Sequence, residues 1–293
     1  MLWFGKRSRS RFGDYFVARL VHRGEKSMVF EASKMTSERR VAIKLYTASY
    51  DRAAAKLERK YGMPSEAEVG RMLNPGDGPG RDVPIVATIG DGREYGKRRG
   101  ARYIVQEFVE GVSLKRMIAC DDPSLRRNVG AHVFQLCRAL REVHKKGFVY
   151  RDFCADNIIL GRGGELTLID LGFVAPSGLA FVERSGTPSY MSPEQIRGEK
   201  LGPASDIYSL GVVLYELLCG RPPFVSQIAL DDEANAPRRR AEIMKMHLEQ
   251  PPPPLPDSVR ERARVLSEVV PRCLAKRPAD RYGTVDELMG ALM

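Results

Sequence analysis

The segment that most constrains this chain lies near its middle, where Asp152 is followed by Asn157 and then by Asp170. The asparagine comes five residues after the first aspartate, and the second aspartate comes eighteen residues after it. Carboxylate and amide oxygens are ligands that Mg²⁺ prefers, and a carboxylate can also accept a proton from a hydroxyl group. This spacing therefore predicts the acidic centre of a metal-dependent phosphoryl-transfer site.

The composition is that of an ordinary globular protein. The chain has 293 residues, of which 43% are hydrophobic and 29% are charged, enough for one large domain or two lobes. It contains no run of about eighteen uncharged apolar residues, so we expect no transmembrane segment. Its five cysteines are scattered and form no CxxC pair. We therefore expect reduced thiols, no cysteine metal site and a cytoplasmic protein.

The net charge of +10 favours an anionic ligand or partner. No nucleic acid is expected, because no aromatic residues are interleaved with the basic clusters, which are Lys6–Arg11, Lys97–Arg99 and Arg238–Arg240. Residues 1–12 form a basic N-terminal extension, which we expect to fray or to pack on the first lobe. The alternative is a weak peripheral contact with a membrane surface.

The hydrophobic pattern changes from strands to helices near Gly111. Before it, apolar runs predict antiparallel strands, namely Phe16–Val21, Met28–Ala32, Val41–Leu45, Ile85–Ile89 and Tyr103–Phe108. The stretch 51–73 has a helical composition but is broken by Gly62 and Pro64. The main helix is therefore placed at 65–73, with Ser65 as its cap.

After Gly111 the apolar periodicity predicts helices. They comprise an amphipathic helix from about Val133 to His144, a buried helix at Ser205–Leu218, and closing helices at Val259–Cys273 and Val285–Leu292. The sequence therefore predicts an α+β protein with a small β-rich lobe at 13–110 and a larger helical lobe at 111–293.

Lys44 at the end of a predicted strand is a further candidate site residue. The tetrapeptide Val41–Lys44 is a weak motif by itself, but its position before the Asp152 segment strengthens it. Glu66 on the predicted helix is the expected ion-pair partner of this lysine, and Glu68 is the alternative.

Several segments in this order resemble the protein kinase family, and bacterial Hanks-type Ser/Thr kinases in particular. They are Val41–Lys44, Tyr150–Asn157, Asp170–Gly172, Gly186–Gln195, Asp206–Gly211 and Arg277–Tyr282. The resemblance covers residues 13–292 and implies a single kinase domain with the bilobal protein kinase fold. It also implies that Asp206 steadies the catalytic loop and that Arg281 pairs with Glu194.

The resemblance implies a role for each candidate residue. Asp152 would orient the substrate hydroxyl and take its proton, while Asn157 and Asp170 would hold Mg²⁺. Lys44, paired with Glu66, would position the α- and β-phosphates of ATP.

The resemblance also implies an adenine site. Its residues would be Val29, Ala42 and Ile159 around the base, the backbone of Glu107 to Val109 as hydrogen-bonding edge, and Gln106 as gatekeeper. The alternative interpretation is that these residues only form the cores of strands.

The phosphate-binding loop departs from the family pattern. The family has Gly-x-Gly-x-x-Gly-x-Val, whereas this chain has the sequence His22-Arg23-Gly24-Glu25-Lys26-Ser27-Met28-Val29. Glycines in such a loop let backbone amides approach the phosphates closely. We therefore expect His22, Gly24 and Ser27 to contact ATP, with weakened binding.

Gly70 departs from the pattern as well, since it lies one turn after Glu66 where the resemblance predicts an apolar side chain. A glycine inside a helix costs about 1 kcal/mol relative to alanine. The hypothesis is a loosely held helix that needs a partner or phosphorylation to set Glu66.

Cys154 replaces the lysine that neutralises the γ-phosphate in the family. Losing one such contact raises the barrier by roughly 3–4 kcal/mol. Lys26 and Arg184 are the candidates for a relocated cation. Redox sensing by Cys154 is a weaker hypothesis, because acidic neighbours disfavour the thiolate.

The predicted function is ATP-dependent phosphorylation of serine or threonine in protein substrates, slow or conditional because of Cys154. Gly186-Thr187-x-x-Tyr190 resembles the Ser/Thr form of the substrate loop. One alternative is a pseudokinase that acts as a nucleotide-binding or scaffolding module. Another is an enzyme that transfers a different part of ATP or uses a non-protein acceptor.

Regulation is expected through the segment that precedes the substrate loop. In the family, the arginine at the position of Arg151 pairs with a phosphorylated activation segment. The available hydroxyls are Ser177, Ser185 and Thr187. Ser185 is favoured, because Thr187 is expected to contact Asp152. An activating partner is the other route.

Overall fold

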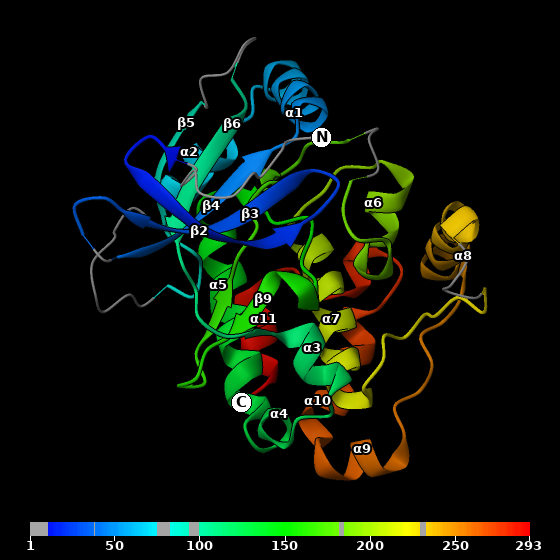
Figure 1. The fold of residues 1–293 in the computed structure, drawn as a ribbon. Helices are drawn as coiled ribbons and strands as arrows, with labels where there is room; N and C mark the ends of the chain where they lie inside the picture. The colour runs from blue at the N-terminus through cyan, green and yellow to red at the C-terminus, as the bar shows by residue number, and fades with distance from the viewer. Residues whose placement is uncertain (1–10, 38, 75–82, 94–99, 182–184, 229–232) are drawn as a thin grey trace. The chain divides into compact units, whose positions relative to one another are not determined.

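The computed structural model describes residues 11–37, 39–74, 83–93, 100–181, 185–228 and 233–293 (Figure 1). Two compact units divide the chain. The first comprises residues 1–82 and 86–110, and the second comprises residues 83–85 and 111–293. Across the described ranges no helix has both the length and the apolar character needed to cross a bilayer.

The first unit is built on one antiparallel sheet with the strand order β1-β2-β3-β4-β6-β5. Its strands are β1 (Arg11–Phe12), β2 (Tyr15–Arg23), β3 (Ser27–Lys34), β4 (Arg40–Tyr46), β5 (Thr88–Arg93) and β6 (Arg102–Glu107). Four of the predicted strands are confirmed in this sheet, as β2, β3, β4 and β6. β1 consists of two residues that the sequence assigned to the N-terminal extension.

The predicted strand at Ile85–Ile89 is wrong at its start. Ile85 forms an isolated bridge with Leu168 in the second unit, and β5 begins at Thr88. Residues 85–87 are each 1–2% exposed. Burial alone therefore explains the apolar run that suggested a strand there. β5 ends at Arg93, and residues 94–99 lie outside the described part.

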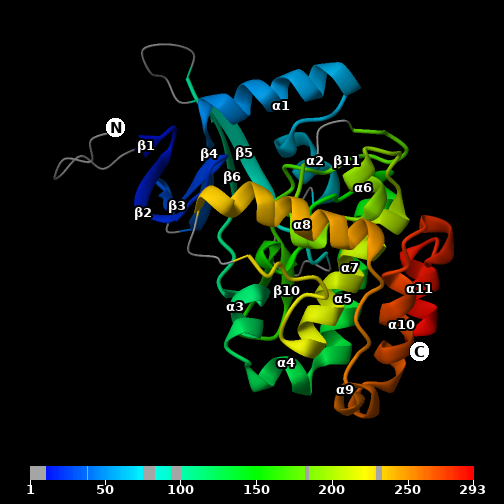
Figure 2. The same cartoon turned by 90° about the vertical axis from the view of Figure 1, so that its right-hand side faces the viewer.

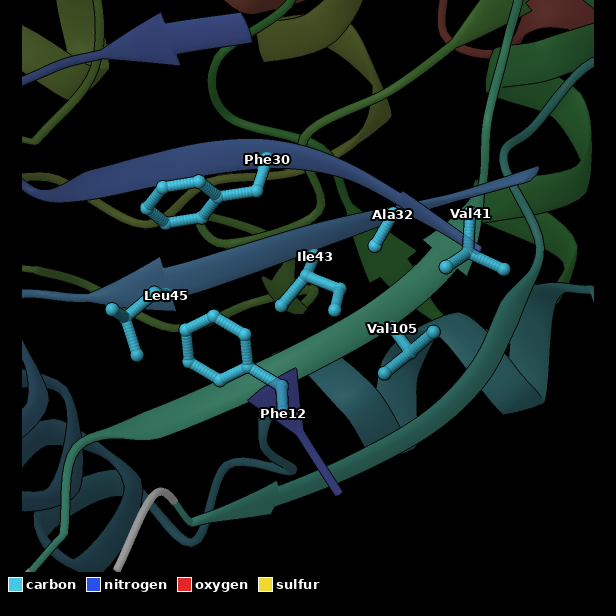
Figure 3. Packing of buried hydrophobic residues seen from close by; sticks show 7 residues of the cluster. All are labelled: Phe12, Phe30, Ala32, Val41, Ile43, Leu45 and Val105. Atoms are coloured by element: carbon cyan, nitrogen blue, oxygen red, sulfur yellow. The ribbon is translucent and has the colours of Figure 1, made fainter. Parts of the chain in front are cut away.

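One face of the sheet carries the core of the first unit. Successive side chains of a strand point to opposite faces, so Val41, Ile43 and Leu45 of β4 share the face that Phe30 of β3 also lines. Figure 3 shows these residues gathered over the sheet, with the ring of Phe12 against them. Lys44, between Ile43 and Leu45, consequently belongs to the other face.

Two helices follow β4 along the chain. α1 (Ala48–Tyr61) is capped by Thr47 and ends at Gly62, which has a left-handed conformation with φ 62°. α2 (Glu66–Leu73) begins with a capping box formed by Ser65 and Glu68. The helix predicted at 65–73 is confirmed, and the helical composition before Gly62 belongs to a separate helix.

The second unit is mostly helical. Its small sheets contain β7 (Val112–Ser113), β8 (Phe148–Val149), β9 (Ile158–Leu160), β10 (Leu166–Leu168) and β11 (Ala175–Pro176). Its helices are α3 (Leu114–Ala119), α4 (Pro123–Arg127), α5 (Val129–Lys145), α6 (Pro193–Arg197), α7 (Pro203–Cys219), α8 (Ala236–Glu249), α9 (Asp257–Arg262), α10 (Arg264–Cys273) and α11 (Val285–Ala291). Short 3₁₀ turns add η1 (Ala155–Asn157), η2 (Pro188–Tyr190), η3 (Glu233–Asn235) and η4 (Pro278–Asp280).

The predicted helices of this unit are confirmed with two corrections. The helix expected at Val259–Cys273 is divided into α9 and α10, because Ala263 leaves the helical region with φ −136° and ψ 53°. α8, which can be followed in Figure 2, was not predicted. His247 is its only buried residue, so α8 has no apolar stripe for a periodicity analysis to detect.

A buried ion pair joins α6 to the loop after η4. Arg281 Nη1 and Nη2 donate to Glu194 Oε1 and Oε2 at 2.7 and 2.9 Å. Their side chains are only 0% and 2% exposed. Arg281 also donates to the backbone carbonyls of Ala275 and Ala204. The guanidinium therefore has several fixed acceptors, as a buried charge requires.

Replacing Arg281 with leucine should lower the free energy of unfolding by about 3–5 kcal/mol, because it leaves the buried Glu194 carboxylate without its charge partner. Arg277 of the same loop pairs with Asp280 at 3.8 Å, but its side chain is 79% exposed. The matched control Arg277→Leu should therefore change stability by only about 0–1 kcal/mol. Urea unfolding measures both, and equal losses would contradict the assignment.

The same ion pair predicts an acid limit to stability. Burial would raise the pKa of Glu194, but the hydrogen bonds and charge of Arg281 hold it below its ordinary value of 4.5. A lowered pKa in the folded state stabilises the protein above pH 4.5, and this contribution disappears as the pH falls through the folded-state pKa. The stability difference between wild type and Glu194→Gln should therefore shrink below pH 4.5 in urea titrations. A difference that stays constant to lower pH would contradict this.

Candidate active site

The first unit holds Lys44 against Glu66. Lys44 Nζ lies 3.0 and 3.2 Å from the two carboxylate oxygens of Glu66, and the side chains are 10% and 7% exposed. Glu66 is the first residue of α2, where the positive end of the helix dipole favours a carboxylate. The expected pair is therefore present, in a largely desolvated setting.

Glu68, the alternative partner, has another task. Its carboxylate accepts hydrogen bonds from the backbone N–H and the hydroxyl of Ser65 at 2.8 and 2.7 Å. These bonds lower the pKa of Glu68. The capping box thus fixes where α2 begins, and with it the position of Glu66.

The phosphate-loop candidates lie in the hairpin between β2 and β3. His22 is paired with Val29 across the two strands, and the Gly24 N–H donates to the Ser27 carbonyl at 2.9 Å. A Cβ atom on Gly24 would lie 3.1 Å from His22 Nε2. The turn is therefore compact beside a histidine where the family has glycine. The backbone carbonyl of Lys26, in this turn, accepts a hydrogen bond from the backbone N–H of Thr47.

The adenine candidates of the first unit lie on β3, β4 and β6. Ala42 is paired with Gln106, which is buried. Among the described residues, Gln106 Nε2 has no hydrogen-bond partner. The Glu107 N–H donates to the Ala87 carbonyl at 3.1 Å. Ile159, the candidate of the second unit, is half-buried in β9.

The second unit brings Asp152 and Asn157 together. Asn157 Nδ2 donates to the backbone carbonyl of Asp152 at 3.0 Å and to its Oδ2 at 3.2 Å. The amide nitrogen is thus used by Asp152, which leaves Asn157 Oδ1 as the atom suited to a metal ion. The other oxygen, Asp152 Oδ1, accepts the backbone N–H of Thr187 at 2.7 Å. The expected contact between Thr187 and Asp152 is present.

Asp170 follows β10, and the pairing of β10 with β9 brings the backbone next to Asp170 into contact with Asn157. The Ile169 N–H donates to the Asn157 carbonyl at 2.9 Å, and Asp170 Oδ1 accepts the Gly172 N–H at 3.0 Å. The described residues contain no cluster of three His, Cys, Asp or Glu side chains able to hold a metal by themselves. One carboxylate and one amide oxygen fit Mg²⁺, which usually takes its remaining ligands from phosphates and water.

Asp206 at the start of α7 holds the backbone just before Asp152. Its carboxylate accepts the backbone N–H groups of Tyr150 and Arg151 at 2.7 and 2.9 Å, and its Oδ2 lies 2.8 Å from His144 Nε2. Arg151 has φ 70°, which is rare for a residue with a side chain. Gln195 Nε2 donates to its carbonyl at 2.8 Å. The loop is therefore fixed from both sides in a strained conformation.

Cys154, two residues after Asp152, is buried. It is 1% exposed, and the Thr187 hydroxyl donates to its Sγ at 3.8 Å. Burial raises the pKa of the thiol, and the Asp152 charge raises it further. The thiol is consequently neutral, which disfavours the redox-sensor hypothesis.

Some of the remaining predicted basic residues and hydroxyl-bearing residues lie in the described part of the chain, and others lie outside it. Arg184 lies outside the described residues, as do residues 1–10 and Lys97–Arg99. Arg151 places its guanidinium over the Phe181 ring at 3.7 Å. The Ser185 carbonyl accepts from Gln195 Nε2 at 2.7 Å, and Ser177 is exposed.

Sequence reasoning missed the side chains that anchor η2, which lies in the predicted substrate loop. His247 Nε2 donates to the Ser189 carbonyl at 3.0 Å, and its Nδ1 accepts the Tyr208 hydroxyl at 2.8 Å. Ser209 Oγ donates to the Tyr190 carbonyl at 2.7 Å. Burial lowers the pKa of His247 to about 3, so the ring stays neutral and keeps this tautomer. Ser209, a polar residue in the largely apolar middle of α7, was the sequence signal that could have found them.

Alkylation of the folded protein should distinguish the cysteines. Cys120 is exposed, whereas Cys154 and Cys137 are buried, and burial raises the pKa of Cys137 to about 12. Iodoacetamide at pH 8 should therefore label Cys120 and spare the other two, as peptide mass spectrometry would show. All should react in guanidinium chloride. Labelling of folded Cys154 as fast as Cys120 would restore the redox-sensor hypothesis.

Comparison with known proteins agrees with this geometry. The family model described as "Protein kinase domain" matches residues 15–291. The serine/threonine-protein kinase PknA of Mycobacterium tuberculosis is 33% identical over 274 residues, which cover 92% of this chain and 58% of PknA. This chain thus spans little more than half the length of that relative.

Two further relatives give the same result. PknB of Mycolicibacterium smegmatis is 32% identical over 215 residues, covering 71% of this chain and 33% of PknB. PknH of Mycobacterium bovis is 30% identical over 285 residues, covering 95% of this chain and 43% of PknH. Both are serine/threonine-protein kinases by name. This chain therefore belongs to the protein kinase family, and its similarity is to bacterial serine/threonine members of that family.

Proposed function

We propose that this protein is an ATP- and Mg²⁺-dependent kinase that phosphorylates serine or threonine in proteins. The observation that carries the proposal is the environment of Asp152. One carboxylate oxygen faces the candidate metal ligand Asn157 and the other faces Thr187 of the substrate loop. A base in this position can meet a substrate hydroxyl on one side and a metal-bound phosphate on the other.

Each proposed residue has a distinct task. ATP supplies the phosphoryl group, and Mg²⁺ neutralises its charge. Asp152 orients the acceptor hydroxyl and takes its proton, while Asn157 and Asp170 are the protein ligands of the metal. Lys44 holds the α- and β-phosphates, and Glu66 keeps its ammonium group in place. Burial of the Lys44–Glu66 pair strengthens this electrostatic interaction.

The nucleotide contacts are the less regular part of the proposal. Gln106 fits a nucleobase, because its buried Nε2 has no partner among the described residues and a base nitrogen can accept a hydrogen bond. The N–H of Glu107 is already used by Ala87, so the Val109 backbone is the proposed hydrogen-bonding edge. Val29, Ala42 and the half-buried Ile159 would supply apolar contacts, and His22, Gly24 and Ser27 would contact the phosphates.

Preference for serine and threonine is proposed from the substrate loop. Thr187 donates its backbone N–H to Asp152 and its hydroxyl to Cys154. Glycine is required before it, because Gly186 has φ 127° and a Cβ atom there would lie 2.9 Å from Gln195 Nε2. The loop therefore arrives at the base in one defined conformation. The extent of the kinase domain, residues 13–292, remains a prediction.

The rival function is a pseudokinase, favoured by Cys154 and by the incomplete glycine loop. An idle site has no reason to keep desolvated charges, since a lone buried charge destabilises the fold. Lys44 and Glu66 are nevertheless retained and paired, and Asp152 is retained with Asn157. Catalysis is therefore the preferred proposal. Phosphorylation of Ser185, paired with Arg151, remains the proposed activation route.

Phosphate transfer tests the function directly. The protein, incubated with labelled ATP, Mg²⁺ and a generic basic protein, should transfer label to serine or threonine. Asp152→Asn and Asp170→Asn should abolish transfer while the fold, followed by circular dichroism, is unchanged. Nucleotide binding by wild type without any transfer would instead favour the pseudokinase.

Replacing Cys154 with lysine should raise the turnover rate, by up to about 100-fold, because it restores a cation at the γ-phosphate. Cys154→Met adds comparable length without charge and is the matched control, for which no gain is expected. Both are compared by initial rates and by thermal unfolding. A folded Cys154→Lys variant with no gain would mean that another group, such as Lys26, already supplies the cation.

A further inference from the structure

Tyr46 shares with Lys44 the face of β4 that is turned away from the main core. The two residues are separated by one position, so the alternation of strand side chains places them side by side on this face. Tyr46 is 3% exposed and packs against Ala67 of α2 and Ile104 of β6. Packing alone would need only an aromatic ring at this position.

The hydroxyl of Tyr46 has a specific partner. It donates a hydrogen bond to Glu66 Oε2 at 2.5 Å, while Lys44 Nζ lies 3.0 Å from Oε1 and 3.2 Å from Oε2. Hydrogen bonds from a hydroxyl to an ionised carboxylate are short and roughly twice as strong as neutral ones. The carboxylate of Glu66 is thus held by two side chains of the same strand.

The ring of Tyr46 is itself braced by neighbouring side chains. It stacks on Tyr50 of α1 with the centroids 5.4 Å apart, and the Arg102 guanidinium lies 5.4 Å from its centroid. Arg102 in turn pairs with Asp51 and Glu58 of α1 at 2.9 and 2.8 Å. These contacts leave the phenol little freedom, so its hydroxyl is preorganised toward α2.

α2 needs such an anchor because its own structure is weak. It has only eight residues and carries Gly70 in its second turn. Short helices are marginal without tertiary contacts, and glycine destabilises them further. A firm bond to the first residue of the helix therefore has a large influence on how well α2 is held.

We propose that Tyr46 is a positioning residue, which holds Glu66, and through it Lys44, in the geometry needed for phosphate transfer. The inference deepens the proposed kinase function and rests on it. It assigns to one hydroxyl of β4 the support that an apolar side chain at Gly70 would otherwise give to α2.

The test compares Tyr46→Phe with Tyr103→Phe. Both remove one hydroxyl and keep the ring. Tyr103, however, packs against the main core on the other face of the sheet, with its ring 5.4 Å from that of Phe12. Hydrogen–deuterium exchange of the α2 amides, measured without nucleotide, should accelerate about tenfold in Tyr46→Phe and stay unchanged in Tyr103→Phe. Equal exchange in both variants would overturn the proposal.

Kinetics supply the second readout. Tyr46→Phe should lower kcat about tenfold with little change in the KM for a peptide substrate, because Lys44 and Glu66 act on the phosphates. In a Glu66→Gln background the same change should have little further effect on exchange or on rate, since the two residues act as one unit. Additive effects would show that Tyr46 acts only through packing.

The outcomes separate this inference from the kinase function itself. If wild type transfers no phosphate, the function fails, and the exchange experiment still decides whether Tyr46 holds α2. If wild type is active and Tyr46→Phe matches it in both exchange and kcat, the function stands and the positioning role is wrong.

Discussion

The carboxylate of Asp206 is the interaction on which the candidate site depends. It binds two consecutive backbone amides, those of Tyr150 and Arg151, and His144 lies beside it. Backbone N–H groups inside a protein must find acceptors, and a buried carboxylate must find donors. Here the two backbone N–H groups donate to the Asp206 carboxylate, which satisfies both. The loop is therefore attached to α7, and Arg151 can keep its strained backbone angle. The position of Asp152 follows from that loop.

The lysine-to-cysteine replacement changes the electrostatics of the site without disturbing its framework. Cys154 is buried and neutral and accepts a hydrogen bond from the Thr187 hydroxyl, while the Thr187 backbone N–H donates to Asp152. Under the proposed function, the replacement removes the lysine charge that the family places where negative charge gathers during phosphate transfer. The first unit departs from the family in a similar way. Gly70 stands in α2 where the resemblance predicts an apolar side chain, while Tyr46 donates a hydrogen bond to Glu66.

Sequence reasoning was most successful where a residue type has one physical use. Lys44 was located by its place at the end of a predicted strand before the Asp152 segment, and Glu66 by its place on the predicted helix at the spacing of the family. Sequence reasoning failed where the apolar pattern of the residues does not match the secondary structure that they form. α8 buries only His247 and shows no apolar stripe, whereas residues 85–87 are apolar and buried but belong to no strand of the main sheet. Only tertiary contacts distinguish such cases.

The sequence by itself indicated the family, many of the strands and helices, and the candidate catalytic residues. These follow from local spacing and from residue chemistry, which the chain carries wherever it folds. The tertiary structure decided which partner each residue has. Glu66 rather than Glu68 meets Lys44, because Glu68 is used in the helix cap. Hydrogen bonds depend on distances of a few tenths of an ångström, which only the packed chain sets.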